Sequence, residues 1–227
     1  MSDPEAFRLL QTVEESGDVD ATMALLRKFF RGFPVEHLRR LLFSDNRVAV
    51  KSGAFLVTEL GKDAQPIWKD AATLLTYPDH QVRGDVLDSI LLCSQPADGA
   101  ILASAANLLN DPHPYVRWKL LRLFATLDPD RLESAARLTS GDESEALTWL
   151  TDLAKETVPA DTIGSALASP ALQMRLIAVS GALRVFKNDP QWLDLAARSE
   201  HEEVATNAND LLSLEKDLAK IRGDRHY

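Results

Sequence analysis

Residues 108–124, LLNDPHPYVRWKLLRLF, predict two helices joined by a tight turn. Asp111 and Pro112 end the first helix, because proline lacks an N–H donor and its ring clashes with the preceding helical turn. Apolar residues then return at helical spacing, at Val116 and at the positions four, five and eight residues later. This spacing gives the second helix one apolar face.

The same pattern occurs twice earlier in the chain. Residues 74–83, LLTYPDHQVR, match it position by position, and residues 41–48, LLFSDNRV, are a third copy displaced by one residue in its turn. We take the first apolar residue of each second helix as the reference position of its repeat. In the three copies it is Val48, Val82 and Val116, which lie 34 residues apart in both intervals. A fixed period of this length predicts an array of helical pairs.

Weaker copies follow, with reference positions at Ala146, Met174 and Val204, about 28 to 30 residues apart. The sequence therefore predicts a single array over residues 1–227. We expect about six helical pairs over residues 35–214, an N-terminal cap over 1–34 and a C-terminal end over 215–227. A separate helix from Leu211 to Ile221 is expected to close the array.

The Asp111, Pro112, Val116 and Arg117 turn resembles that of the HEAT repeat family, in particular its short bacterial members. The resemblance implies an all-α fold of the α-α superhelix type, a HEAT-like solenoid of the armadillo-like kind. It also implies that second helices line a concave binding face. In such arrays the arginine after the reference position, as at Arg83, often pairs with the turn aspartate of a neighbouring repeat.

Composition supports the all-α class and an acidic protein. The 227 residues are 45% hydrophobic, carry a formal charge of −9 and include only 10 glycines and 11 prolines. No sustained alternation of apolar and polar residues predicts a strand. Negative charge spread along the chain argues against a nucleic-acid partner, which usually requires a basic face. One basic stretch is an exception and could be solvated or could bind an anion: Arg27, Lys28, Arg31, Arg39, Arg40, Arg47 and Lys51.

Three features of the sequence bear on the cellular compartment of the protein and on the state of its cysteine. No window of about 18 uninterrupted apolar residues predicts a membrane span. The acidic start, MSDPE, argues against a secretory signal. The only cysteine, Cys93, follows two leucines on a predicted helix, so we expect a buried structural thiol. These features predict a cytoplasmic protein.

The sequence contains no specific catalytic motif, so no enzyme activity, cofactor or metal site is predicted. His80, His113 and His201 occupy equivalent turns. Successive turns of stacked helices should lie on the order of 10 Å apart, too far for shared zinc ligation.

The candidate binding residues surround two tryptophans on second helices. Trp118 and Trp149 are expected to project from the packing face toward the concave surface, where tryptophans beside arginines commonly form binding hot spots. The alternative is that each tryptophan packs between repeats. The expected neighbours in the binding site are Lys51, Phe55, Asp85, Asp88, Lys119, Arg122 and Asp152.

Two classes of function remain open. The first is a non-enzymatic scaffold that binds another protein through its concave face. Negative charge would suit a basic partner, for example the toxin of an immunity protein. The second is an enzyme or DNA-binding protein similar to the HEAT-like alkylpurine DNA glycosylases, to which Trp149 and Asp152 are a loose match. A HEAT-like phycobilin lyase is a third, weaker resemblance. The identity of the partner and the oligomeric state do not follow from the sequence.

Overall fold

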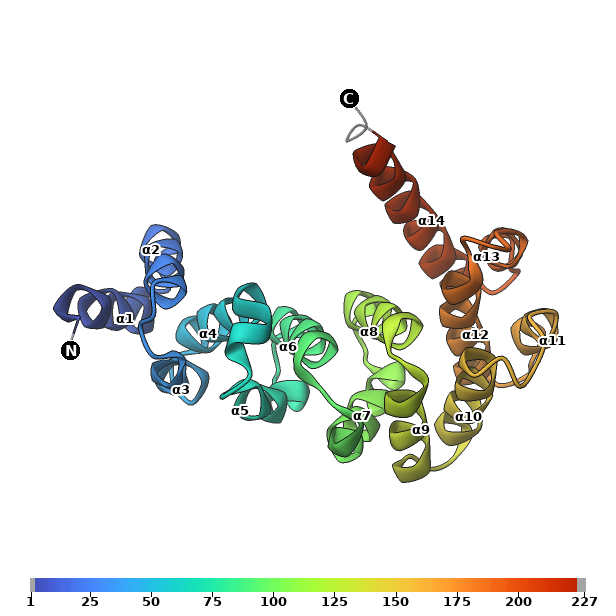
Figure 1. The fold of residues 1–227 in the computed structure, drawn as a ribbon, viewed down its shortest axis with the longest axis horizontal. Helices are drawn as coiled ribbons and strands as arrows, with labels where there is room; N and C mark the ends of the chain where they lie inside the picture. Colours follow the sequence, from blue (N-terminus) through green and yellow to red (C-terminus); the bar gives the residue numbers. More distant parts are fainter. Residues whose placement is uncertain (1–2, 224–227) are drawn as a thin grey trace. The chain divides into compact units, whose positions relative to one another are not determined.

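Every regular element in the part of the chain that the structure describes is a helix (Figure 1). The computed structural model describes the backbone of residues 3–223 and, except at 219 and 221–223, their side chains. No strand occurs in this range. The predicted all-α class is therefore confirmed for these residues.

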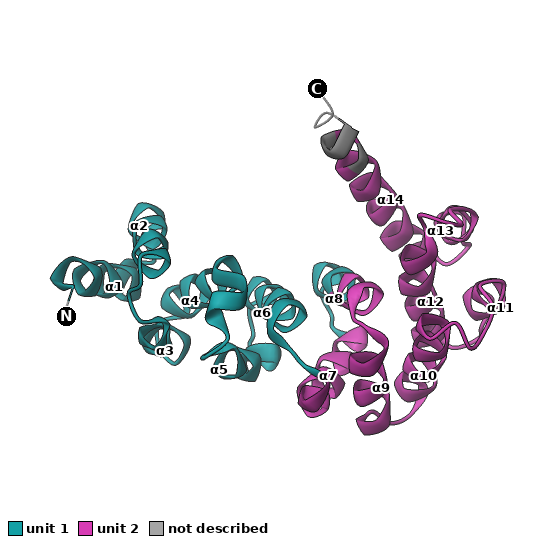
Figure 2. Cartoon of the chain, in the orientation of Figure 1, with its two compact units in different colours: residues 1–95, 111–119 teal, residues 96–110, 120–227 magenta. Residues whose placement is uncertain are grey.

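The helices form two compact units, and the division falls within helix α8 (Pro114–Thr126). Unit 1 comprises residues 1–95 and 111–119, and unit 2 comprises residues 96–110 and 120–227 (Figure 2). The predicted limits of the array, its N-terminal cap and its C-terminal end stay predictions.

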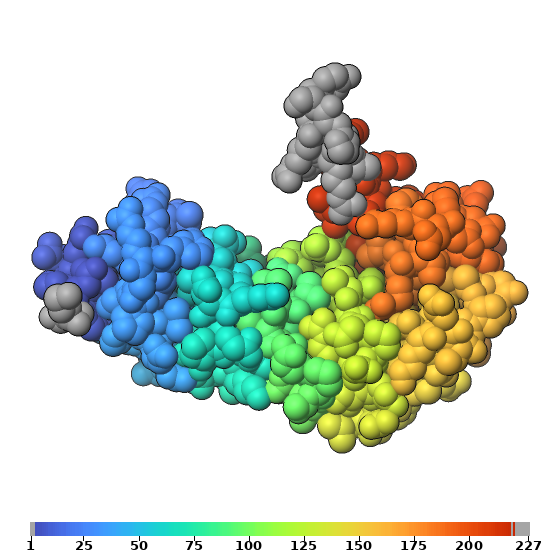
Figure 3. All heavy atoms as spheres, in the orientation of Figure 1, coloured from blue at the N-terminus to red at the C-terminus, as the bar shows by residue number. Residues whose placement is uncertain are grey.

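Unit 1 contains α-helices and short 3-10 helices in alternation with tight turns. Within it α1 packs on α2, α3 on α4, α5 on α6, and α4 on both α2 and α6. Its side chains fill the spaces between neighbouring helices (Figure 3). Apart from the start of α8, the elements of unit 1 are α1 (Pro4–Ser16), α2 (Val19–Phe30), η1 (Val35–Leu38), α3 (Arg39–Leu42), α4 (Arg47–Leu60), η2 (Gly61–Ala64), α5 (Trp68–Ala72), η3 (Thr73–Thr76) and α6 (His80–Cys93).

Side-chain caps fix where the helices of unit 1 begin. The Asp18 carboxylate accepts a hydrogen bond of 2.7 Å from the Ala21 N–H at the start of α2. Asp79 does the same for the Gln81 N–H at the start of α6, also at 2.7 Å. Each cap satisfies a backbone donor that has no partner within the helix. Gly61 ends α4 with a φ of 55°, as its position after the apolar run predicts.

The predicted inward positions are correct for two of the three clear repeats. Val82 and Val116 are fully buried, and so are the residues four, five and eight positions after each. The prediction is wrong for Val48, which is 46% exposed. Ala49, Ala54 and Val57 form the buried face of α4 instead. The reference position of this repeat is therefore Ala49, 33 residues before Val82.

A buried ion pair joins two successive turns of unit 1, as the HEAT resemblance implies. Nε and Nη2 of Arg83 donate to the two carboxylate oxygens of Asp111 at 2.7 and 2.8 Å. Arg83 also donates to the backbone oxygens of Tyr77 and Pro78 at 2.7 and 3.0 Å. The Asp111 carboxylate in turn accepts from the His113 N–H at 2.8 Å. One aspartate thus caps its own turn and neutralises the arginine of the preceding repeat.

Unit 2 continues the alternation of helices. α7 packs on α9, α9 on α10, α10 on α12, α11 on α12, and α13 on α14. Residues 211–221 are helical, as expected, but they continue the helix of residues 202–223 and do not form one of their own, because no glycine or proline interrupts it before Gly223. In chain order the elements are η4 (Pro96–Asp98), α7 (Gly99–Ala106), η5 (Asn107–Asn110), the second part of α8, α9 (Pro129–Leu138), α10 (Asp142–Ala154), α11 (Thr162–Leu167), α12 (Leu172–Val185), α13 (Gln191–Ala197) and α14 (Glu202–Gly223).

Two side chains of α12 bind the C-terminal carbonyl groups of α8 within unit 2. The Ser180 hydroxyl donates to the Leu121 oxygen at 2.9 Å. The Arg184 guanidinium donates to the oxygens of Phe124, at 3.2 Å, and Leu127. Burial lowers the pKa of this guanidinium from its ordinary value. Arg184 therefore serves as a cap for the last turn of α8, where a cation is favourable.

Candidate binding groove

An open groove lies in unit 1 on α2, α4, α6 and the start of α8. Its volume is about 540 Å³. One part of its lining is apolar and the other part is aromatic and charged. The lining residues are Gly17, Val19, Thr22, Met23, Val48, Lys51, Ser52, Phe55, Gln81, Asp85 and Tyr115.

The apolar part of the groove consists of aliphatic side chains that the fold leaves in contact with solvent. Val19 is 73% exposed, Met23 36% and Val48 46%. Phe55 continues this surface and is half-buried against the core of the unit. Scattered exposed apolar residues are ordinary, but several lining one hollow indicate a contact surface.

Asn46 fixes the position of Val48 beside the turn between α1 and α2. Its side-chain amide donates to the backbone oxygens of Glu14 and Glu15 at 2.7 and 3.2 Å, while its oxygen accepts from the Val48 N–H at 3.0 Å. Gly17 has a φ of 60°, and a Cβ added there would lie 1.9 Å from Cγ1 of Val48. Only glycine allows this close approach of the turn to α4. This wall of the groove is therefore held in place by contacts within unit 1.

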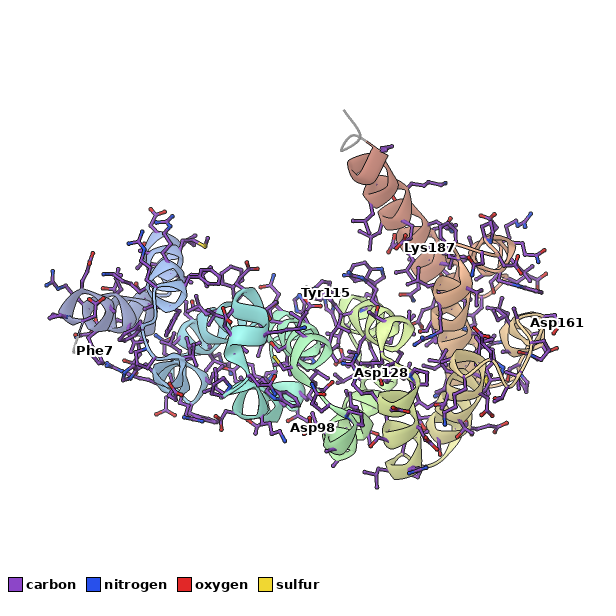
Figure 4. The ribbon with its side chains drawn as sticks, viewed as in Figure 1. Phe7, Asp98, Tyr115, Asp128, Asp161 and Lys187 are labelled. Atoms are coloured by element: carbon purple, nitrogen blue, oxygen red, sulfur yellow. The ribbon has the colours of Figure 1, made fainter. Side chains whose placement is uncertain are left out.

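Tyr115 forms the aromatic part and stands at the N-terminal end of α8, beside α6 (Figure 4). Its ring packs on Gly84, where an added Cβ would lie 2.5 Å from Cε1 of the ring. Trp118 stacks on the ring with centroids 6.4 Å apart. His80 and His113 stack on one another at 3.7 Å and meet Tyr115 edge to face, at 6.1 and 6.4 Å. The orientation of Tyr115 is thus fixed from several sides.

The contact between His80 and His113 corrects one expectation. Helix packing distances predict that successive turns keep their histidines apart, but both side chains turn toward each other and stack. Because the two imidazole rings stack in parallel, their edges do not converge on a common point where a metal ion could be shared. Among residues 3–223, no group of three or more histidine, cysteine or acidic side chains could hold a metal ion.

The groove lining carries two charged side chains, Lys51 on α4 and Asp85 on α6. Burial, together with the charges of Asp88 and Asp79, raises the pKa of the Asp85 carboxyl group to about 6, although Lys119 and Lys51 act to lower it. Its backbone oxygen accepts from the Thr58 hydroxyl at 2.8 Å. Its carboxylate has no hydrogen bond or ion pair with any residue in the described part of the chain. A partly buried carboxylate therefore faces the groove without a bound cation.

The structure brings part of the predicted site together. Lys51, Phe55 and Asp85 line the groove. Asp88 and Lys119 form an ion pair next to it, with side chains 27% and 13% exposed, and the Lys119 ammonium lies 5.5 Å from the centre of the Tyr115 ring. Trp118 is half-buried against Tyr115. Six of the nine predicted residues thus lie in or beside one groove of unit 1.

The other three predicted residues belong to unit 2. The half-buried Trp149 donates from Nε1 to the Thr162 hydroxyl at 3.3 Å, and its ring lies against Gly181, where an added Cβ would be 2.8 Å away. Asp152 lines a polar pocket of about 190 Å³ between α9 and α10. Arg122 is half-buried. Trp149 thus packs α10 against α11 and α12.

Sequence reasoning missed four residues of the groove lining, the aliphatic Val19, Met23 and Val48 and the aromatic Tyr115. A weak signal existed, since Val48 stands one residue out of register with the other copies. Three of the seven residues of the basic stretch form ion pairs within the fold: Lys28 binds Asp3 and Glu5, Arg39 binds Asp70, and Arg40 binds Glu14.

Cys93 is fully buried, as predicted, and its thiol donates to the Gly61 oxygen at 3.3 Å. Burial raises the pKa of this thiol to about 11, so it is not a reactive thiolate at neutral pH. No helix within residues 3–223 has the length and apolarity needed to cross a membrane.

No family model matches the chain. No curated protein matches it either. Among solved structures, one engineered protein of the Northeast Structural Genomics Consortium matches with a TM-score of 0.47 and 14% identity, over 92% of this chain and 67% of that one. A second engineered protein of that consortium matches with a TM-score of 0.44 and 17% identity, over 93% and 89%. Neither is described by a ligand or partner, so a function for this chain has to rest on its own residues.

Proposed function

We propose that this protein is a non-enzymatic scaffold of the HEAT-like solenoid class and that it binds a segment of another protein through the groove on α2, α4, α6 and α8. One observation carries the proposal: Val19, Met23 and Val48 expose aliphatic surface to the same hollow. The second helices provide the lining, as the resemblance to HEAT repeats implies for a concave binding face.

The energy of this surface suits a protein segment. Full burial of an aliphatic side chain contributes about 1.5 to 3 kcal/mol. The three side chains are already partly covered, so burying what remains exposed supplies roughly 2 to 5 kcal/mol of that favourable energy. Association costs about 4 kcal/mol or more in lost freedom of motion. A small molecule that covers only these three would bind weakly, whereas a segment that also contacts Phe55 and Tyr115 would gain further apolar contact.

The rigidity of the groove supports the same proposal. Gly17 and Asn46 fix Val48, and the packing on Gly84 fixes Tyr115. A pre-organised site loses less conformational entropy when its partner binds. The DNA-glycosylase alternative has no comparable support. It rests on Trp149 and Asp152, and the Trp149 indole contacts Thr162 and Gly181 within the fold.

The test compares Met23→Asp with Leu138→Asp. Met23 lines the groove, whereas Leu138 is an equally apolar residue, 62% exposed, outside the groove lining. Each immobilised protein captures partners from extracts of the source cell, and bound proteins are quantified by mass spectrometry. We expect at least one protein that wild type and Leu138→Asp retain equally and that Met23→Asp retains at least tenfold less. Thermal melts establish that all three proteins are folded.

Equal capture by all three folded proteins would refute the proposed function. The DNA alternative has its own measurement, a titration with labelled duplex DNA at low salt. Binding that weakens steeply as salt is added would favour DNA as the partner.

A further inference from the structure

We propose that the segment bound in the groove presents a lysine or arginine side chain to Asp85, beside the aliphatic surface of Val19, Met23 and Val48. This inference rests on the proposed function and adds the chemistry of the partner. It follows from the position and the neighbours of one carboxylate.

Asp85 is the acidic residue of the groove lining, and its own lysine neighbours do not bind it. Lys119, on α8, is engaged by Asp88 one helical turn farther along α6. Lys51, on α4, is exposed and forms no ion pair with Asp85. Asp79, before the first turn of α6, and Asp88 add negative charge around the site. A cation from outside would therefore supply the ion-pair partner that Asp85 lacks.

On α6, Asp88 already binds a cation beside an aromatic ring. The Lys119 ammonium binds the Asp88 carboxylate and lies 5.5 Å from the centre of the Tyr115 ring. Asp85 precedes Asp88 by three residues, which places both on one side of α6. Tyr115 and Asp85 line the same groove. A partner cation at Asp85 would thus form a second ammonium or guanidinium contact with a carboxylate, next to an aromatic ring.

Burial raises the pKa of Asp85 to about 6, so at neutral pH the carboxylate is mostly ionised although it has lost part of its hydration. Charge-assisted hydrogen bonds to such a group are stronger than those between neutral groups. An acidic partner segment would place like charges beside Asp85 and Asp88. We therefore expect selection against acidic segments.

The experiment starts from a displayed library of random peptides selected on the wild-type protein at neutral pH, with Met23→Asp as the counter-selection. We expect enriched peptides that combine aliphatic residues with one lysine or arginine. The best peptide is then synthesised with this residue and with norleucine in its place. Affinities are measured by isothermal titration calorimetry for wild type, Asp85→Asn and Asp63→Asn. Asp63 is exposed on η2 and lies outside the groove lining, which makes it the matched control.

Asp85→Asn should weaken binding of the cationic peptide about tenfold or more and leave the norleucine peptide within about twofold, equivalent to about 1.4 and 0.4 kcal/mol. Asp63→Asn should change neither. Acidification to about pH 5 should weaken only the cationic peptide, because protonation removes the charge of Asp85.

Two failures are distinguishable. If no peptide depends on Met23, the proposed function fails. If peptides depend on Met23 but lack a cation, or if Asp85→Asn binds them as wild type does, this inference is overturned while the proposed function stands. Enrichment of acidic peptides would also overturn it.

Discussion

Replacing Asp111 by asparagine should destabilise unit 1 by about 3 kcal/mol, the lower end of the usual cost of breaking a buried ion pair. The side chains of Arg83 and Asp111 are 9% and 3% exposed, so the variant leaves a guanidinium buried without its counter-charge. The lower end applies because Arg83 keeps the backbone oxygens of Tyr77 and Pro78 as acceptors. Asparagine can still accept from the His113 N–H, so the change removes charge and keeps the cap of the turn.

Urea unfolding followed by circular dichroism gives the free energy of unfolding, and native-state hydrogen exchange of peptides from α6 assigns the loss to unit 1. The matched control is Asp70→Asn. Asp70 binds Arg39 at 2.7 Å, with side chains 31% and 44% exposed, so its loss should cost less than about 1 kcal/mol. If Asp111→Asn costs no more than Asp70→Asn, the buried pair does not stabilise the unit as its geometry implies.

Three further changes test the groove. Gly84→Ala should lower the free energy of unfolding by about 1 kcal/mol, because displacing the Tyr115 ring costs more than the improved helix propensity returns; a higher melting temperature would contradict this. Asn46→Ala should cost about 1 to 2 kcal/mol, since it removes the cap of α4 and the bonds to Glu14 and Glu15, and a calorimetric melt measures the loss. Asp85→Asn should make stability less dependent on pH. The folded pKa of Asp85, about 6, exceeds its ordinary value of 3.8, so the native state binds more protons and wild type loses stability as pH rises between these values. Solvent screening limits this loss to about 1 to 2 kcal/mol, and urea titrations at several pH values should show wild type and Asp85→Asn converging near pH 4 and diverging above pH 6.

Local sequence patterns predicted the helical class and the principal turns of unit 1. Asp111 and Pro112 define a turn from short-range stereochemistry, and the burial of Val82 and Val116 follows from helical periodicity. The prediction was wrong at Val48 because alanine is a weak hydrophobic signal. The 34-residue interval selects Val48, whereas the small side chain of Ala49 fits the tightly packed face of α4.

The groove was harder to predict, because a sequence does not show which apolar residues the fold leaves uncovered. Met23 belongs to the apolar run of its helix and resembles a core residue until the helices are placed. Phe55, Lys51 and Asp85 line one groove and follow the exposed side of α4 and α6, the kind of position that helical spacing can indicate. Trp149 shows the limit of this reasoning, since its ring fits against Gly181 and packs between helices.

The hydrogen bonds from α12 to the end of α8 determine when the end of α8 can be completed during synthesis. The Leu121, Phe124 and Leu127 oxygens obtain donors that lie 57 to 60 residues later in the chain. A ribosome that adds 5 to 20 residues per second needs about 3 to 12 s to supply them. During this interval the last turn of α8 emerges with its carbonyl groups still bound to water. A nascent chain that stalls before Ser180 would keep this segment open to chaperones and proteases.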